Sequence, residues 1–151
     1  MIYTELTNKA LTIAYRAHHG QLDKSGMPYI FHPVHLAEQM KDEISVCVAL
    51  LHDVVEDTAV TAKELEMLFP HEVMIPVKLL TREKGTDYFE YIKKLRDNPV
   101  AMTVKLADLE HNMDQTRFAG CAQVSREQLN KWKNKYSKAK KILYSCTSER
   151  G

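Results

Sequence analysis

The stretch that decides the fold reads Val46-Cys47-Val48-Ala49-Leu50-Leu51-His52-Asp53-Val54-Val55-Glu56-Asp57. Its first half is apolar on all sides, which is typical of a helix buried on every face, and we expect one helix from about Ser45 to Asp57. Its second half carries an imidazole and three carboxylates. At about 100° per residue these four side chains fall within an arc of about 140°. The sequence therefore predicts a core helix whose last turns bear a polar cluster on one side.

Working outward, the 3.6-residue period of helices dominates the chain on both sides of this stretch. Besides the core helix, we expect helices at about 4–18, 33–40, 61–70, 72–82, 87–96, 98–116 and 125–146, with a loop at 20–28. Capping patterns support three of these starts: Thr4, Thr61 followed by Glu64, and Asn98-Pro99. No segment alternates with period two for long enough to form a strand. The prediction is an all-α bundle of about seven or eight helices, one domain over residues 1–151.

Composition excludes several classes of protein. Lys plus Arg is 21 and Asp plus Glu is 20, so the formal net charge is +1. The chain therefore lacks the excess of basic residues that would indicate a nucleic-acid partner. Cys47, Cys121 and Cys146 form no C-x-x-C pair, which argues against a zinc finger and favours free thiols. The first residues lack the pattern of a signal peptide, and no apolar run could span a membrane. We expect a cytoplasmic protein; its oligomeric state is left open.

The polar cluster predicts a metal site. Carboxylates at the end of a helix are disfavoured by its dipole and by burial, and a divalent cation would offset both costs. Imidazole and carboxylate together are ligands that such a cation accepts. Asp108 and Asn112 lie four residues apart, hence on one helix face, and Asp108 stands among apolar neighbours. His32, just before Pro33, is a further candidate in this company.

Three separated strings now resemble a known family. They are Gly20-Gln21 with Lys24-Ser25-Gly26-x-Pro28-Tyr29-Ile30-x-His32-Pro33, then Ala49 to Thr58, then Lys105-Leu106-Ala107-Asp108-x-x-His111-Asn112-Met113. His32, His52-Asp53 and Asp108 match the H…HD…D pattern of the HD metal-dependent phosphohydrolases. The longer strings resemble the hydrolase domain of RelA/SpoT proteins over residues 6–117. Because a synthetase or regulatory domain cannot fit in the rest of the chain, we expect it to be similar to the small, stand-alone alarmone hydrolases.

The resemblance implies an HD-domain fold that removes the 3′-pyrophosphate of guanosine tetra- or pentaphosphate. It implies manganese, or another divalent metal, held by His32, His52, Asp53 and Asp108. It further implies that Glu56 and Asp57 orient or deprotonate the attacking water, and that Lys24, Ser25 and Asn112 bind the nucleotide. From their charge, Arg82, Lys105 and Arg117 are candidates to neutralise phosphates. Two alternatives stay open: a hydrolase of another nucleotide, and a nucleotide-binding module without turnover.

One position departs from the pattern of the family. Its members commonly carry Arg before Lys-Ser-Gly, where it flanks the guanine base, and this chain has Asp23 there. A carboxylate lacks the flat cationic surface of a guanidinium and repels phosphates. It could instead accept hydrogen bonds from the amino group of a base, so adenine-containing alarmones are an alternative substrate.

Overall fold

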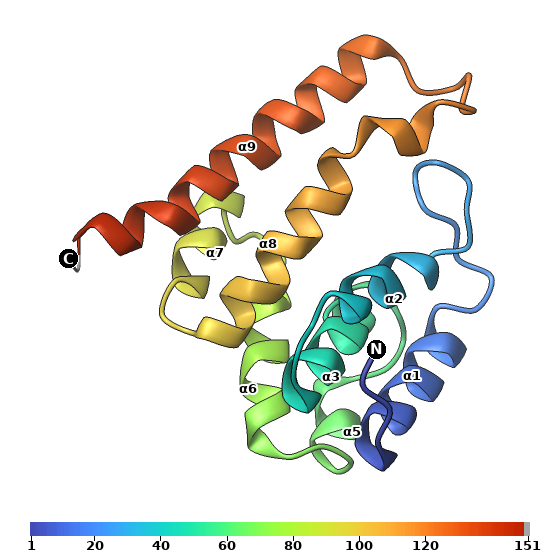
Figure 1. The fold of residues 1–151 in the computed structure, drawn as a ribbon, viewed down its shortest axis with the longest axis vertical. Helices are drawn as coiled ribbons and strands as arrows, with labels where there is room; N and C mark the ends of the chain where they lie inside the picture. The colour runs from blue at the N-terminus through green and yellow to red at the C-terminus, as the bar shows by residue number, and fades with distance from the viewer. Residues whose placement is uncertain (150–151) are drawn as a thin grey trace.

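The computed structural model describes residues 1–149 of the chain, with side chains through Ser145 (Figure 1). Cys47 and Cys121 are free thiols, whereas Cys146 lies outside the described side chains. Within residues 1–149 the chain forms nine α-helices and one 3₁₀ helix, and the all-α prediction is confirmed. Their bounds are α1 Glu5–Ala17, α2 Phe31–Glu38, α3 Glu43–Leu51, α4 Val54–Asp57, α5 Ala62–Glu66, α6 His71–Leu80, α7 Tyr88–Leu95, α8 Pro99–Met113, η1 Gln115–Phe118 and α9 Arg126–Glu149.

Helix α3 is the centre of the fold, as its apolar sequence predicts. It packs against α1, α2, α6 and α8, and every residue from Ser45 to Leu51 is buried. The Asp42 side chain caps its start by accepting a hydrogen bond from the N–H of Ser45. The residues that follow the end of α3, His52 and Asp53, lie close to side chains of α2 and α8. Among the described residues, no helix is both long and apolar enough for a membrane span.

The expected single helix from Ser45 to Asp57 is wrong in one respect: it is interrupted at His52 and Asp53. The Nδ1 atom of His52 lies 2.6 Å from the carbonyl oxygen of Ala49 and donates a hydrogen bond to it. A continuous helix would offer that carbonyl to the N–H of Asp53. Asp53 instead leaves the helical region, with φ −109° and ψ 1°, and α4 begins after it. This break adds one helix to the eight that the sequence predicts.

The predicted helix starts are confirmed by their caps. Thr4 and Thr61 form capping boxes, and the Asn98 side chain accepts from the N–H of Ala101 before a proline at the first helical position. The end of α8 differs from the expectation, because Asp114 adopts an extended conformation and caps η1 through Thr116. A local side-chain hydrogen bond has therefore replaced the last turn of the expected helix.

Two segments that are distant in sequence frame the end of α3. In Figure 1, α9 runs along α8 on the upper side of the molecule, and it also packs against α7. The loop between α1 and α2 lies beside the segment that follows α8 (Figure 1). This loop closes on itself through an isolated bridge between Leu22 and Pro28, and Gly26 turns it with φ 88°. Asp53, at the break in the core helix, thus lines one cavity together with residues of this loop, α8 and α9.

Candidate functional site

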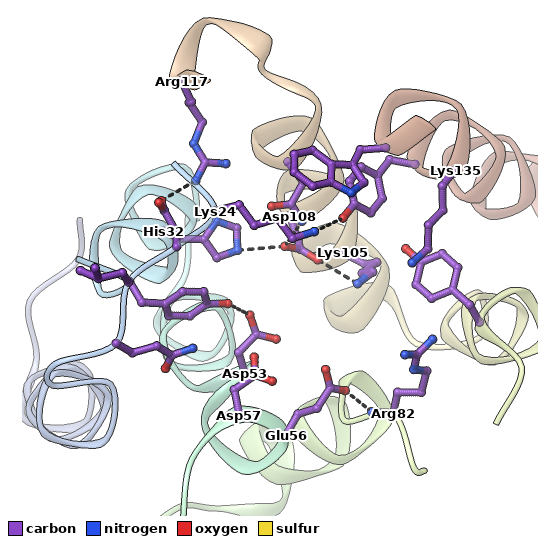
Figure 2. Close-up of a pocket in the computed structure, with 18 of the residues that line it drawn as sticks. Lys24, His32, Asp53, Glu56, Asp57, Arg82, Lys105, Asp108, Arg117 and Lys135 are labelled. Carbon is purple, nitrogen blue, oxygen red and sulfur yellow. Dashed lines mark hydrogen bonds and ion pairs between the residues drawn. The ribbon is translucent and has the colours of Figure 1, made fainter. Parts of the chain in front are cut away.

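Four side chains predicted to bind metal meet at the break in the core helix. The Nε2 atom of His32 on α2 lies 2.9 Å from Oδ1 of Asp108 on α8. The Nε2 atom of His52 lies 3.0 Å from Oδ2 of Asp53 and 3.8 Å from Oδ1 of Asp108. His32, His52 and Asp108 are each at least 95% buried, while Asp53 reaches the cavity drawn in Figure 2.

The geometry of His52 fits a cation ligand. Since Nδ1 donates to the Ala49 carbonyl, Nε2 of the neutral ring carries a lone pair. This Nε2 atom is buried and has no hydrogen-bond partner of acceptable geometry among the described residues. It faces the carboxylate oxygens of Asp53 and Asp108, so a positive charge is needed between them. A hydrogen bond that fixes the far ring nitrogen is the usual arrangement of a metal-binding histidine. The residues present fit a divalent cation.

The pKa values report the same need for positive charge. Burial opposes the charged imidazolium of His52, but the carboxylates of Asp53 and Asp108 together outweigh it and hold the His52 pKa well above its usual value. Burial likewise opposes ionisation of Asp108, yet the ammonium of Lys105, 2.8 Å from Oδ2, acts together with His32 and His52 to hold the pKa of Asp108 well below its usual range. The Tyr29 hydroxyl donates a hydrogen bond to Asp53 and orients it. Both carboxylates are therefore ionised and fixed.

The two predicted catalytic acids lie beside the metal candidates on α4. Glu56 accepts a hydrogen bond of 2.6 Å from the N–H of Arg82, which sets its orientation. Burial raises the pKa of Asp57 to about 6, helped by the negative charges of Asp53 and Glu56. Asp53, Glu56 and Asp57 also have carboxylate oxygens within 4.8 Å of one another. Asp57 is thus a proton acceptor poised near neutral pH.

A wall of cations faces these acids across a cavity of about 390 Å³. Three positive groups surround the ring of Tyr88: Nζ of Lys135 lies 4.3 Å from its centroid, Cζ of Arg82 5.4 Å and Nζ of Lys105 5.9 Å. Burial and repulsion from Arg82, Lys24 and Lys105 lower the pKa of Lys135. The Tyr88 hydroxyl is buried and has no hydrogen-bond partner among the described residues. Three positive groups beside a hydroxyl donor that has no partner form a site that can bind an anion.

The predicted substrate-binding residues divide between two places. Lys24 and Asn112 line the cavity, and the Asn112 amide donates 3.0 Å to Oδ1 of Asp108. Ser25 lies outside this lining and donates through Oγ to Asp23. Asp23 also accepts hydrogen bonds from two backbone N–H groups of the loop and from the guanidinium of Arg117. The carboxylate that replaces the usual arginine is therefore engaged within the protein.

Sequence reasoning did not assign nine of the cavity-lining residues to the site: Gln21, Leu22, Tyr29, Tyr88, Tyr91, Phe118, Trp132, Lys135 and Tyr136. Tyr29 stands in a quoted motif, directly after Pro28 and three residues before His32, and its spacing could have suggested the site. The α9 residues carried no such signal, because a tryptophan, lysine and tyrosine at helical spacing fit any amphipathic helix. His111, which stands in the third quoted string, contacts His32 through the two Nδ1 atoms at 2.7 Å.

Comparison with known proteins shows the family to which the chain belongs. A family model described as an HD domain matches residues 10–134. The chain is 37% identical over 123 residues to the GTP pyrophosphokinase rsh of Brucella melitensis and 40% identical over 121 residues to the bifunctional (p)ppGpp synthase/hydrolase SpoT of Escherichia coli. These alignments cover 72% and 70% of this chain, which spans only 16% and 17% of the length of those relatives.

A solved structure also shares the fold. It is that of a metazoan ortholog of SpoT that hydrolyzes ppGpp, and it matches with a TM-score of 0.72. The match covers 100% of this chain and 98% of the other at 23% identity. The family model, the all-helical fold and the meeting of two histidines with two aspartates at one break in the core helix lead to one conclusion: the chain belongs to the HD-domain family.

Proposed function

We propose that this protein is a metal-dependent hydrolase that removes the 3′-pyrophosphate from guanosine tetra- or pentaphosphate, giving GDP or GTP and pyrophosphate. The observation that carries the proposal is the cavity itself, where a His/Asp cation site and two carboxylates face a wall of three cations. A substrate with phosphates at two places suits this arrangement, since one group meets the cation site and another the cationic wall. The similarity to SpoT supports the same reading.

His32, His52, Asp53 and Asp108 would hold the cation, and we propose manganese because the donor set mixes imidazole and carboxylate. A divalent ion bound there polarises the phosphoryl group and acidifies water. Tyr29 and Lys105 keep the two aspartates in place through hydrogen bonds. Asn112, fixed by Asp108, projects its amide into the same cavity, where it can contact the sugar.

The proposed reaction exchanges one P–O bond for another. Water attacks the phosphorus attached to the 3′ oxygen, and Asp57 accepts the proton that the water loses. The bond between that phosphorus and the 3′ oxygen breaks, and the oxygen leaves with the ribose and takes up the proton that Asp57 accepted, which restores the Asp57 carboxylate. Glu56, held by the N–H of Arg82, orients the water. Arg82, Lys105 and Lys135 balance the charge of the phosphates.

We further propose that residues 1–151 act as one domain in the cytoplasm on a small nucleotide. The free thiols of Cys47 and Cys121 support a reducing compartment, and the net charge of +1 gives no support for a nucleic-acid partner.

A panel of substrates tests the function. The protein is loaded with manganese and incubated with guanosine and adenosine 3′-pyrophosphates, GTP and ATP, while pyrophosphate release is followed. We expect release from guanosine tetraphosphate together with GDP in equal amounts. Release from the adenosine compound alone would assign a different substrate. No release from any of them, with metal retained, would favour a nucleotide-binding module and contradict the hydrolase.

The raised pKa of Asp57 predicts the pH dependence. A general base must be ionised, and the Asp57 pKa lies at about 6 without a cation, so kcat falls as pH drops through that region. A bound cation stabilises the carboxylate and moves the apparent pKa to 6 or below. The measurement is a kcat profile from pH 4.5 to 8.5 in wild type and in Asp57→Asn, which should lose this limb. A profile that rises toward acid would contradict the assignment.

A further inference from the structure

The wall of the cavity opposite the cations is built around an ion pair between distant parts of the chain. The Nη2 atom of Arg117, in η1, lies 2.9 Å from Oδ2 of Asp23 in the loop between α1 and α2 (Figure 2). Their side chains are only 16% and 10% exposed. The pair joins the loop to the end of α8, and Arg117 lines the cavity.

The guanidinium of Arg117 is held on two sides. Nη1 donates to the carbonyl oxygen of His111 at 2.8 Å, while Nη2 donates to Asp23. Asp23 is itself fixed, because its Oδ1 accepts from the N–H and hydroxyl of Ser25 and from the N–H of Met27. The orientation of a planar cation is thus set before any ligand arrives, which lowers the entropy cost of binding.

Other flat surfaces stand beside this cation. The ring of Phe118 lies 5.8 Å from Cζ of Arg117 and 5.6 Å from the ring of Trp132. Lys24, next to Asp23, places Nζ 4.3 Å from the centre of the Trp132 ring. All of these residues line the cavity. The cavity therefore has one end that holds the Asp23–Arg117 pair, Lys24 and two aromatic rings, and another end with three positive groups around Tyr88.

We propose that Arg117, oriented by Asp23, is a substrate-binding residue that binds the nucleobase of the substrate by stacking. This inference rests on the proposed function, since it presumes a nucleotide substrate. Arg117 suits a base better than a phosphate because Asp23 already neutralises its charge and two of its N–H groups are engaged. Three further N–H groups and the planar face of the guanidinium remain, and such a face stacks on planar rings. At the other end, Lys105 is paired with Asp108, but Arg82 and Lys135 have no carboxylate partner among the described residues and can meet phosphates.

Asp23 then acts through Arg117 as a positioning residue. Its two oxygens accept four hydrogen bonds from the protein, so it is not arranged to select an amino group of the base. A stacked guanidinium reads the face of a ring and tolerates different exocyclic groups. The inference therefore commits to a ligand that carries a nucleobase, with the contribution of Arg117 similar for GDP and ADP.

Calorimetric binding to the manganese-loaded protein tests this role without turnover. The probes are GDP and ADP, which have a base, and inorganic pyrophosphate, which has none. We expect Arg117→Lys, which keeps the charge and loses the plane, to weaken GDP and ADP by about tenfold, the scale of one base stack. Its affinity for pyrophosphate should stay within about twofold of wild type. The matched control is Arg16→Ala, an exposed arginine on α1, which should change nothing.

A double-mutant cycle tests Asp23. Asp23→Ala should weaken GDP binding in the wild-type background and cause no further loss when Arg117 is already alanine. An independent loss in that background would show that Asp23 does not act through Arg117. Equal loss of GDP and pyrophosphate with Arg117→Lys would place Arg117 on the phosphates, and unchanged GDP binding would also overturn the proposal. An Arg117-dependent base site without release of pyrophosphate from any alarmone would contradict only the hydrolase.

Discussion

Asp53→Ala is expected to abolish both cation binding and turnover. Asp53 faces the unpartnered Nε2 of His52 at 3.0 Å, so its loss removes one proposed ligand and the charge that balances the ion. A catalytic cation supplies several kcal/mol of transition-state stabilisation, and about 4 kcal/mol corresponds to a loss of roughly 10³-fold in kcat. The measurements are manganese binding by calorimetry and pyrophosphate release from guanosine tetraphosphate.

The fold of this variant can be checked separately. Asp53 lies at the interruption between α3 and α4 and belongs to no helix, so helical circular dichroism should be retained. Adding manganese should raise the melting temperature of wild type and leave that of the variant unchanged, because a ligand stabilises only the state that binds it. Glu72→Gln, an exposed acid on α6, serves as the control. A variant with full turnover would show that the metal assignment is wrong.

Asp57→Asn is expected to lower kcat by about 10²- to 10⁴-fold, the usual contribution of a general base, while KM changes little. Asparagine keeps the size of the side chain and loses the ability to accept a proton. Glu56→Gln should cost less, because the glutamine oxygen can still accept the N–H of Arg82. Single-turnover pyrophosphate release with saturating substrate separates these effects from binding.

Stability distinguishes a catalytic Asp57 from a structural one. Its folded pKa, about 6, is raised above the ordinary value of 3.8, so the folded protein without metal loses stability as pH rises between these values. At neutral pH this cost is fully present, and asparagine removes it. Asp57→Asn should therefore be at least as stable as wild type in chelator at pH 7 by thermal melting. A marked drop in melting temperature would indicate a structural role instead.

The sequence alone determined most of the helices. The apolar run of α3 and the caps at Thr4, Thr61 and Asn98 act over a few residues, so their effect can be read locally. The break at His52 was not predicted, because it depends on the His52 side chain donating a hydrogen bond to a helical carbonyl in place of a backbone N–H. Helical spacing predicts His52 and Glu56 on one side of a single helix. The helix is interrupted between them, but the tertiary structure still places Glu56 in the cavity lining and His52 beside Asp53, which lines the same cavity.

Only the tertiary structure decided which polar groups meet. His32 and Asp108 are 76 positions apart, and Asp23 and Arg117 are 94 apart. Their pairing depends on how α2 and α8 pack on α3, and on where the loop closes, which no local pattern encodes. The residue types alone predict a cation site and a phosphate-bearing ligand. The packing of helices fixed which carboxylate faces the cation site, and which one orients an arginine at the opposite wall.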